Sequence, residues 1–332
     1  MAKTFRLPKE EPLLNIASYA RGGPSAANRL TPEQVEQIRR TVQRAPEAVV
    51  KVLPRSSNDL KAVGKHLDYI GRQGHLALES DDAQQVHGRI GKELLEDWDL
   101  DIDDVRRQGS LSAANGRKPP KLVHKLMFSM PPGTPPQKVL SAVRNLAREE
   151  FYGQHRYALV LHTDEPHPHV HLVLKAVSEQ GERLNIKKAT LRHWRSKFAH
   201  HLRGLGVAAN ATERAVRGES RSAKKDGIFR SSLRGDSKFM RARAHAVAAE
   251  VVTGNLRDDL GGKSLFETRS RVVQGWQAVA RRLSAQGERA LSDDITGFIL
   301  GMKPVRADKA RIAHEMIEAT NTRQRAERVR AR

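Results

Sequence analysis

The spacing of apolar residues along the chain predicts strands that alternate with helices. Four short runs are rich in branched and aromatic residues, as in buried strands, and they span 48–53, 121–130, 156–162 and 168–177. Two other segments repeat apolar residues three to four positions apart, which is typical of one helix face. The first stripe is Leu60, Val63, Leu67 and Ile70, and the second is Leu191, Trp194, Phe198 and Leu202. Further helices are predicted at 135–150 and, as an amphipathic helix, from Asp82 to about Trp98.

This pattern divides the chain into four parts. Residues 1–44 contain the breaker Gly22-Gly-Pro24 and are expected to be poorly ordered. Residues 45–213 carry the predicted strands and form one domain. Residues 214–240 are basic and rich in Gly and Ser, as in a linker. Residues 241–332 are predicted to be a helical C-terminal region with a basic tail.

The charge balance points to a polyanionic partner. Among 332 residues, 59 are Lys or Arg and 38 are Asp or Glu, which gives a formal net charge of +21. Nucleic acid is the first choice for such a surface. Aromatic residues make up only 5% of the chain, so stacking of bases on aromatic rings is not expected to dominate binding. No apolar run approaches the roughly 18 residues that span a bilayer. We therefore expect no membrane insertion and a cytoplasmic location, which the absence of Cys also favours.

Four of the 14 histidines fall within the ten residues 162–171. The flanks of this segment read as strands and residues 163–166 read as a turn, so a β-hairpin is predicted. Alternation along the second strand places His167, His169 and His171 on one side, and His162 can face the same side from the first strand. Neutral imidazole is the commonest side-chain ligand of transition metals. The alternatives are a purely structural cluster and a structural zinc site, which usually has four ligands and often uses Cys.

These residues also carry a family resemblance. The pattern His-x-Asp-x-x-His-x-His-x-His, which begins at His162, resembles the metal motif of the VirD2-like conjugative relaxases in the His-hydrophobic-His endonuclease superfamily. Val170 is the hydrophobic residue of that name. One position departs from the pattern, because Lys175 stands where the family usually has Asn. The resemblance covers about residues 45–210 and implies a relaxase-like α/β (α+β) fold, with helices packed on one face of a central antiparallel sheet.

Two further stretches resemble relaxase motifs. The segment His66-Leu-Asp-Tyr-Ile-Gly-Arg-Gln-Gly resembles the first motif, in which the Tyr is the nucleophile, and this resemblance implies that role for Tyr69. The residues alone would instead favour an aromatic side chain at the edge of the core. Phe128-Ser129, followed by Pro-Gly-Thr, resembles the second motif, and it implies that Ser129 helps to hold DNA near the scissile phosphate.

The resemblance and the spacing together suggest a role for each residue. We expect Mg²⁺ or Mn²⁺ on His162, His169 and His171, where it would neutralise charge on the phosphate. His167 is a candidate third ligand, supporting group or proton acceptor. Asp164 is a candidate for orienting an imidazole or for deprotonating Tyr69. Four cations on the predicted helix that follows the hairpin are candidates for binding DNA phosphates, namely Lys187, Lys188, Arg192 and Arg195.

The predicted function is that of a relaxase, a site- and strand-specific DNA endonuclease and transesterase. It would nick a transfer origin through a covalent 5′-phosphotyrosine and rejoin the strand, for mobilisation of a plasmid or integrative element. Other options are a rolling-circle replication initiator or single-Tyr transposase with the same site, a hydrolytic metal nuclease, and a non-catalytic nucleic-acid-binding protein with a structural metal. The resemblance implies as partners transfer-origin DNA that is single-stranded at the nick, accessory nicking proteins and a type IV secretion coupling protein. Export with the DNA to a recipient cell is a further option.

Overall fold

The computed structural model describes most of the chain and divides it into two compact units. The described residues are 16–19, 29–53, 59–89, 91–111, 120–219, 228, 231–232, 234–254, 262–305 and 307–330. Those of the first unit lie within Gln43–Ala211, and those of the second lie within Leu14–Val42 and Thr212–Arg332. The expected boundaries after residues 44, 213 and 240 stay predictions.

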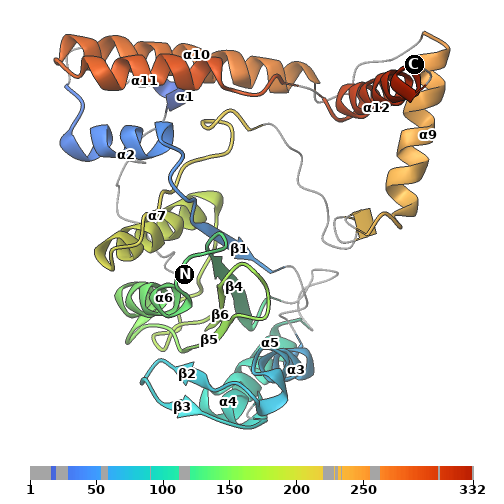
Figure 1. Cartoon of the computed structure of the whole chain (residues 1–332). Coiled ribbons are helices and arrows are strands. Elements are labelled where there is room, and N and C mark those ends of the chain that lie inside the picture. Colours follow the sequence, from blue (N-terminus) through green and yellow to red (C-terminus); the bar gives the residue numbers. More distant parts are fainter. Residues whose placement is uncertain are drawn as a thin grey trace. The chain divides into compact units, whose positions relative to one another are not determined.

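The first unit is built on a six-stranded sheet in which every neighbouring pair is antiparallel (Figure 1). Its spatial order is β1 (Val49–Val52), β4 (Val123–Ser129), β6 (His169–Lys175), β5 (Tyr157–His162), β2 (Leu78–Ser80) and β3 (Gln85–Val86). The four predicted strands are confirmed, and the hairpin β5–β6 lies at the centre. The strands β2 and β3 were not predicted, because three and two residues are too few to show an alternating pattern.

Helices cover both faces of the sheet, not one face as expected. They are α6 (Pro136–Phe151) and α7 (Lys188–Gly204) on one side, and α3 (Leu60–Ile70), α4 (Gly91–Asp97) and α5 (Leu100–Leu111) on the other. Successive residues of β6 point to opposite faces, so Val170, Leu172 and Leu174 join the core under α6 and α7. Val173 joins the core under α3 and α4. His169 and His171 share the parity of Val173 and therefore face the α3 side.

The amphipathic helix expected from Asp82 is wrong at its start. The chain first leaves β2 in a turn at Asp81–Asp82, where Ser80 and Asp82 are hydrogen-bonded and Ala83 has a positive φ of 64°. It then forms β3, and α4 begins only at Gly91. Local side-chain hydrogen bonds of this kind compete with helix formation, and the apolar spacing did not reveal them.

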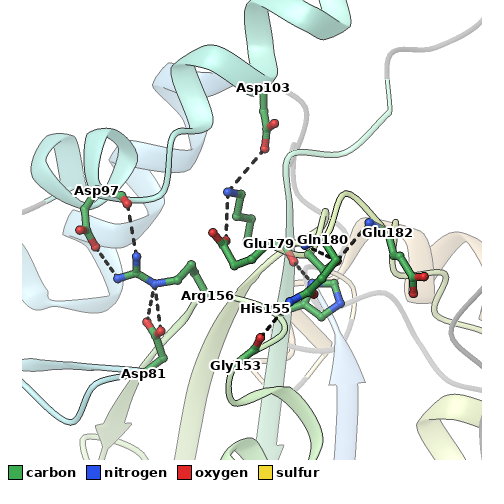
Figure 2. A network of polar contacts seen from close by, with 11 residues as sticks. Asp81, Asp97, Asp103, Gly153, His155, Arg156, Glu179, Gln180 and Glu182 are labelled. Carbon is green, nitrogen blue, oxygen red and sulfur yellow. Dashed lines mark hydrogen bonds and ion pairs between the residues drawn. The ribbon is translucent and has the colours of Figure 1, made fainter. Parts of the chain in front are cut away.

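Charged side chains fix α4 and α5 to the end of the hairpin where β5 begins and β6 ends. Arg156 donates from Nε to Asp81 at 3.0 Å and from a terminal nitrogen to Asp97 at 2.6 Å (Figure 2). Lys175 lies with its Nζ 3.3 Å from Glu179 and 3.9 Å from Asp103. These contacts link β2, α4 and α5 to the central strands.

The second unit is helical among its described residues. A shared apolar core joins α1 (Ile16–Tyr19), α2 (Pro32–Val42), α10 (Gly262–Ala285) and α11 (Arg289–Leu300). A smaller core joins α9 (Lys238–Val252) and α12 (Asp308–Arg330). The predicted helical C-terminal region is confirmed. Within the N-terminal segment expected to be poorly ordered, α2 is a helix whose Ile38 is fully buried.

The sequence also predicted a basic linker and the absence of membrane-spanning helices. Residues 220–227 of the expected linker lie outside the described residues. Over the described part of the chain, helices that combine the length and the apolar character of a membrane span were not found.

Candidate active site

Three histidines converge where the two central strands meet the hairpin turn. His162 ends β5, His169 begins β6 directly opposite it, and His171 follows two positions along β6 on the same face. We call these three residues the histidine triad. All three are buried, and one ring nitrogen from each lies within 4.8 Å of the others. Their ring centroids are 4.7–5.2 Å apart. The strand alternation that predicted this cluster from sequence also produces it.

Backbone carbonyls orient two of the three rings. Nε2 of His162 donates a hydrogen bond to the Ile70 carbonyl at 2.7 Å, and Nδ1 of His169 donates to the His167 carbonyl at 3.0 Å. The other nitrogen of each ring is the one that can offer a lone pair, and in His162 this is Nδ1, which lies 3.2 Å from a terminal nitrogen of Arg72. Such a second hydrogen bond on the far nitrogen is the usual support of a metal-binding imidazole. Among the described residues, the buried Nδ1 of His171 has no hydrogen-bond partner.

The environment disfavours the charged form of His162 and His171. Burial lowers the pKa of His162, and the nearby Arg72 and His169 lower it further. Burial also lowers the pKa of His171 to about 3, with added repulsion from the other two rings of the triad. Neutral imidazole is the form that binds metals. Three imidazoles with converging nitrogens therefore fit a divalent metal ion, with coordination positions left open for oxygen ligands.

Tyr69 lies in the last turn of α3, one residue before the carbonyl that holds His162. Its side chain is 51% exposed, so it does not behave as the core-edge aromatic that composition alone favoured. Its ring stacks on His66 with 6.4 Å between centroids, and the Arg72 guanidinium carbon lies 5.5 Å from its centroid. The nucleophile implied by the resemblance is thus on the face of the sheet that carries the triad.

Asp164 is near the triad, but its side chain binds Arg72 and not, as was expected, an imidazole or Tyr69. Its carboxylate accepts a very short hydrogen bond from Arg72, and the same guanidinium nitrogen lies 3.2 Å from Nδ1 of His162. Any orienting effect of Asp164 on His162 therefore passes through Arg72. Burial raises the pKa of Asp164, but backbone hydrogen bonding and the charge of Arg72 outweigh it, so the pKa lies below its usual value. A depressed pKa makes this carboxylate a weak base.

Two other predicted residues lie at the same end of the sheet. His167 lies two residues before β6 and its side chain is exposed. Its backbone carbonyl accepts the hydrogen bond from Nδ1 of His169. Among the described residues, the group that could hold a metal ion contains His162, His169 and His171, and it does not contain His167. Ser129 ends β4, is half-buried, and pairs in register with His169, which places it beside the triad.

The four predicted DNA-binding cations lie elsewhere. Lys187, Lys188, Arg192 and Arg195 belong to the start of α7, which packs on the face opposite the triad. Trp194 of α7 contacts Phe151, the last residue of α6. The chain continues from Phe151 to the start of β5, and His162 lies at the opposite end of that strand. Their phosphate contacts remain a prediction, and the structure does not bring them to the triad.

Sequence reasoning missed two residues that contact both Tyr69 and the triad. They are His66 and Arg72, and both occur in the stretch that carries the first motif. The signal for His66 was its position three residues before Tyr69, which places both on one face of a helix. Arg72 carried no such signal, because its place depends on the turn that follows α3.

The fold and site agree with a match to a known family. Residues 80–202 match the family described as relaxase, MobA/VirD2-like, nuclease domain. The matched segment includes the triad, Asp164 and Ser129, and it begins after Tyr69. The resemblance to the VirD2-like relaxases predicted from the histidine motif is therefore confirmed.

Two curated proteins and one solved structure are similar to the chain. The chain is 23% identical over 198 residues to the T-DNA border endonuclease VirD2 of Agrobacterium fabrum, covering 52% of this chain and 41% of that protein. It is 25% identical over 189 residues to VirD2 of Rhizobium radiobacter, covering 52% and 43%. The chain thus spans about two-fifths of the length of these curated relatives. A solved structure of the MobM relaxase domain with plasmid oriT DNA, described as Mn-bound, covers 56% of this chain at 13% identity and a TM-score of 0.37.

Proposed function

We propose that this chain is a DNA relaxase that nicks one strand at a transfer origin through Tyr69 and later rejoins it. One observation carries the proposal. The exposed Tyr69 is followed by Ile70, whose carbonyl binds Nε2 of His162 at 2.7 Å, so the helix end that bears the nucleophile is bonded directly to a metal-binding histidine. The confirmed resemblance to VirD2-like relaxases supports the same activity.

The chemistry assigned to the chain's residues is a transesterification. The Tyr69 Oη–P bond forms as the P–O3′ bond of the DNA breaks. The electron pair of that bond stays on O3′, which takes a proton from water and becomes a free 3′-hydroxyl. The phenolic proton passes to solvent. The phosphotyrosine keeps the phosphodiester bond energy, so attack by a 3′-hydroxyl reverses the step.

The triad would hold a divalent metal ion, which we propose is Mg²⁺ or Mn²⁺. When bound, it supplies Lewis-acid neutralisation of the non-bridging phosphate oxygens. Ser129, beside His169 at the end of β4, is proposed to contact the DNA backbone near that phosphate. Because imidazole favours later transition metals over hard Mg²⁺, we expect the isolated protein to bind Mn²⁺ more tightly than Mg²⁺. Calorimetric titration with each ion would measure the difference.

A covalent-adduct assay tests the proposed function. Single-stranded oligonucleotides tiled across the DNA flanking the gene are incubated with protein and Mn²⁺ or Mg²⁺, denatured in detergent, and examined for a protein–DNA band. We expect a band with the wild type and none with Tyr69→Phe. Tyr152→Phe is the matched control, since Tyr152 is 64% exposed but lies after α6, away from the triad.

Other outcomes would favour the alternatives. Cleavage without an adduct would favour a hydrolytic nuclease, and a band that survives in Tyr69→Phe would move the nucleophile to another tyrosine. DNA binding with neither cleavage nor adduct on any oligonucleotide would contradict the relaxase proposal and favour a binding protein. A target at a replication origin or an element end would favour a replication initiator or a transposase.

The remaining partners rest on the resemblance alone. We propose that accessory nicking proteins open the duplex at the origin and that a type IV secretion coupling protein receives the complex. Export with the DNA is part of the same proposal. Pull-down of a coupling protein by the full chain, compared with residues 45–213, would test whether the helical region contributes to that interaction.

A further inference from the structure

The Tyr69 ring is supported from two sides by side chains of its own segment. His66 stacks on it with an interplanar angle of 21° and a centroid separation of 6.4 Å. The Arg72 guanidinium carbon lies over the same ring at 5.5 Å. Aromatic pairs and cation–π contacts at such separations are attractive. An exposed side chain that would otherwise sample several rotamers is thus restrained.

The same two residues also reach the histidine triad. The ring of His66 meets that of His171 edge to face at 6.3 Å. A terminal nitrogen of Arg72 lies 3.2 Å from Nδ1 of His162. Each residue therefore lies between the Tyr69 ring on one side and a ring of the histidine triad on the other.

The backbone at Arg72 has a left-handed conformation that residues other than glycine rarely adopt. Arg72 and Gln73 both have positive φ, at 51° and 57°. Left-handed conformations are strained for non-glycine residues, and they persist where the surroundings hold them. Here Gly74, at φ +98°, packs so closely on Gly88 that a Cβ would lie 2.8 Å from its backbone. The Asp164 carboxylate holds the guanidinium from outside.

We propose that His66 and Arg72 are positioning residues that hold the Tyr69 hydroxyl at the metal site, with Asp164 orienting Arg72. His66 acts by packing its ring, and Arg72 acts through its planar, charged fork. The inference deepens the proposed function and rests on it. A reacting group misplaced by about 1 Å can lose a factor of roughly 100 in rate, so the support of a mobile tyrosine has a measurable effect.

The test for His66 separates packing from proton transfer. In single-turnover adduct formation with Mn²⁺, we expect His66→Ala to be slower by about 100-fold, and His66→Phe, which keeps a ring, to remain within about threefold of wild type. His87→Ala, an exposed histidine in the same unit, is the control and should be unchanged. Equal losses in His66→Phe and His66→Ala would overturn the packing role, and so would no loss in either.

The test for Arg72 uses chemical rescue. We expect Arg72→Ala to slow adduct formation by about 100- to 1000-fold. Added guanidinium ion should then raise the rate of this variant by about tenfold. Arg72→Lys should recover less than the rescued Ala variant, because ammonium cannot reproduce the fork. Asp164→Asn should act in the same direction as Arg72→Ala and should add little to it in the double variant. Rates of Arg72→Ala equal to wild type, or a loss that guanidinium does not change, would overturn the assignment.

Two further readouts distinguish this inference from a failure of the proposed function. Mn²⁺ affinity and oligonucleotide affinity should stay within about threefold of wild type in His66→Phe and in rescued Arg72→Ala. If the wild type forms no adduct, the relaxase proposal fails and the inference fails with it. If the wild type forms an adduct and the variants match its rate, only the positioning role is wrong.

Discussion

The two ends of the hairpin β5–β6 use the same kinds of side chain in opposite ways. At the turn end, three imidazoles bring their nitrogens within 4.8 Å of one another beside an exposed tyrosine. At the other end, Arg156 is bound by Asp81 and Asp97, and Lys175 faces Asp103 and Glu179 (Figure 2). Every charge named at that second end has an opposite charge within 4.0 Å.

Histidines repeat the contrast. His124 and His155, at the paired-charge end, each direct a ring nitrogen to a backbone carbonyl, that of Leu184 and that of Lys175. These two histidines do not converge on one another, although Nδ1 of His124 is also buried without a hydrogen-bond partner among the described residues. His171, at the turn end, is buried with an Nδ1 that has no partner among the described residues. What separates the two ends is convergence, because the ring nitrogens of the triad lie within 4.8 Å of one another, and His124 and His155 belong to no such group among the described residues. Substitutions should therefore affect activity at the turn end and stability at the other.

The largest effect is expected from the double variant His169→Ala, His171→Ala. Loss of two of three ligands removes the metal ion's neutralisation of phosphate charge, which contributes several kcal/mol, so cleavage should fall on the order of 1000-fold. DNA affinity should change little, because the basic surface is intact. Adduct rates, Mn²⁺ titration and oligonucleotide binding would be measured together, with the exposed His200→Ala as control. A collapse of DNA affinity or of folding would mean that the triad is structural.

The next largest effect is a pH dependence of stability at the other end. Burial lowers the pKa of His124 to about 4. Above its ordinary pKa of 6.5 the residue is neutral in both folded and unfolded chains. As the pH falls from 6.5 to about 4, only the unfolded chain takes up the proton, so folding stability is lost across that window. A shift of this size corresponds to about 3 kcal/mol.

His124→Gln provides the comparison for this pH effect, because it keeps a donor for the Leu184 carbonyl but does not titrate. Denaturant unfolding at pH 7 and at pH 4 would give the stability of each protein. We expect the stability difference between variant and wild type to move in favour of the variant as the pH falls. Parallel pH curves for the two proteins would contradict the buried, neutral state of His124.

Sequence patterns predicted the turn end far better than the other end. The triad follows from strand alternation around one short turn, so residues 162–171 contain all the information that places it. The ion pairs of Arg156 connect it to Asp97, which is 59 positions away in the sequence, and to Asp81, which is 75 positions away. These partners lie in the turn after β2 and in α4, where the sequence pattern predicted a single helix from Asp82. Arg72 is an intermediate case, because it lies only three residues from Tyr69. Its contact with Asp164 occurs in a turn where Arg72 and Gln73 both have positive φ. Apolar periodicity carries no signal for such a turn. Long-range pairing and strained turns depend on the finished fold, which is why spacing alone did not identify them.

Arg156→Met should reduce stability without reducing activity. It leaves the mostly buried Asp81, whose side chain is 16% exposed, without its charged partner, and such a loss costs about 2 kcal/mol. The thermal midpoint should fall, while the adduct rate per folded molecule should stay within about twofold of wild type. Lys92→Met, which removes an exposed charge paired within α4, serves as the control and should change neither quantity. A slow but fully stable Arg156→Met would contradict the division between the two ends.

The smallest effect is expected at Lys175, the position where the family pattern usually has Asn. Its side chain is only 6% exposed, and it lies at the end of β6 that is remote from His169. Replacing a buried, paired lysine by an apolar side chain of similar length removes a desolvation cost along with the attraction, so Lys175→Met should remain within about 1 kcal/mol of wild type. Lys175→Glu should be clearly destabilised, because a third negative charge would face Asp103 and Glu179.

Cleavage by Lys175→Asn decides what the departure from the family pattern means. If Lys175 serves only to fix α5 to the sheet, restoring Asn should leave the adduct rate and Mn²⁺ affinity unchanged, and only unfolding should respond. A tenfold change in the adduct rate at unchanged stability would connect this position to the triad and would end the separation of the two ends. Because Lys175 reaches toward Asp103 on α5, while His171 and His169 lie four and six residues earlier along β6, we expect the unchanged rate.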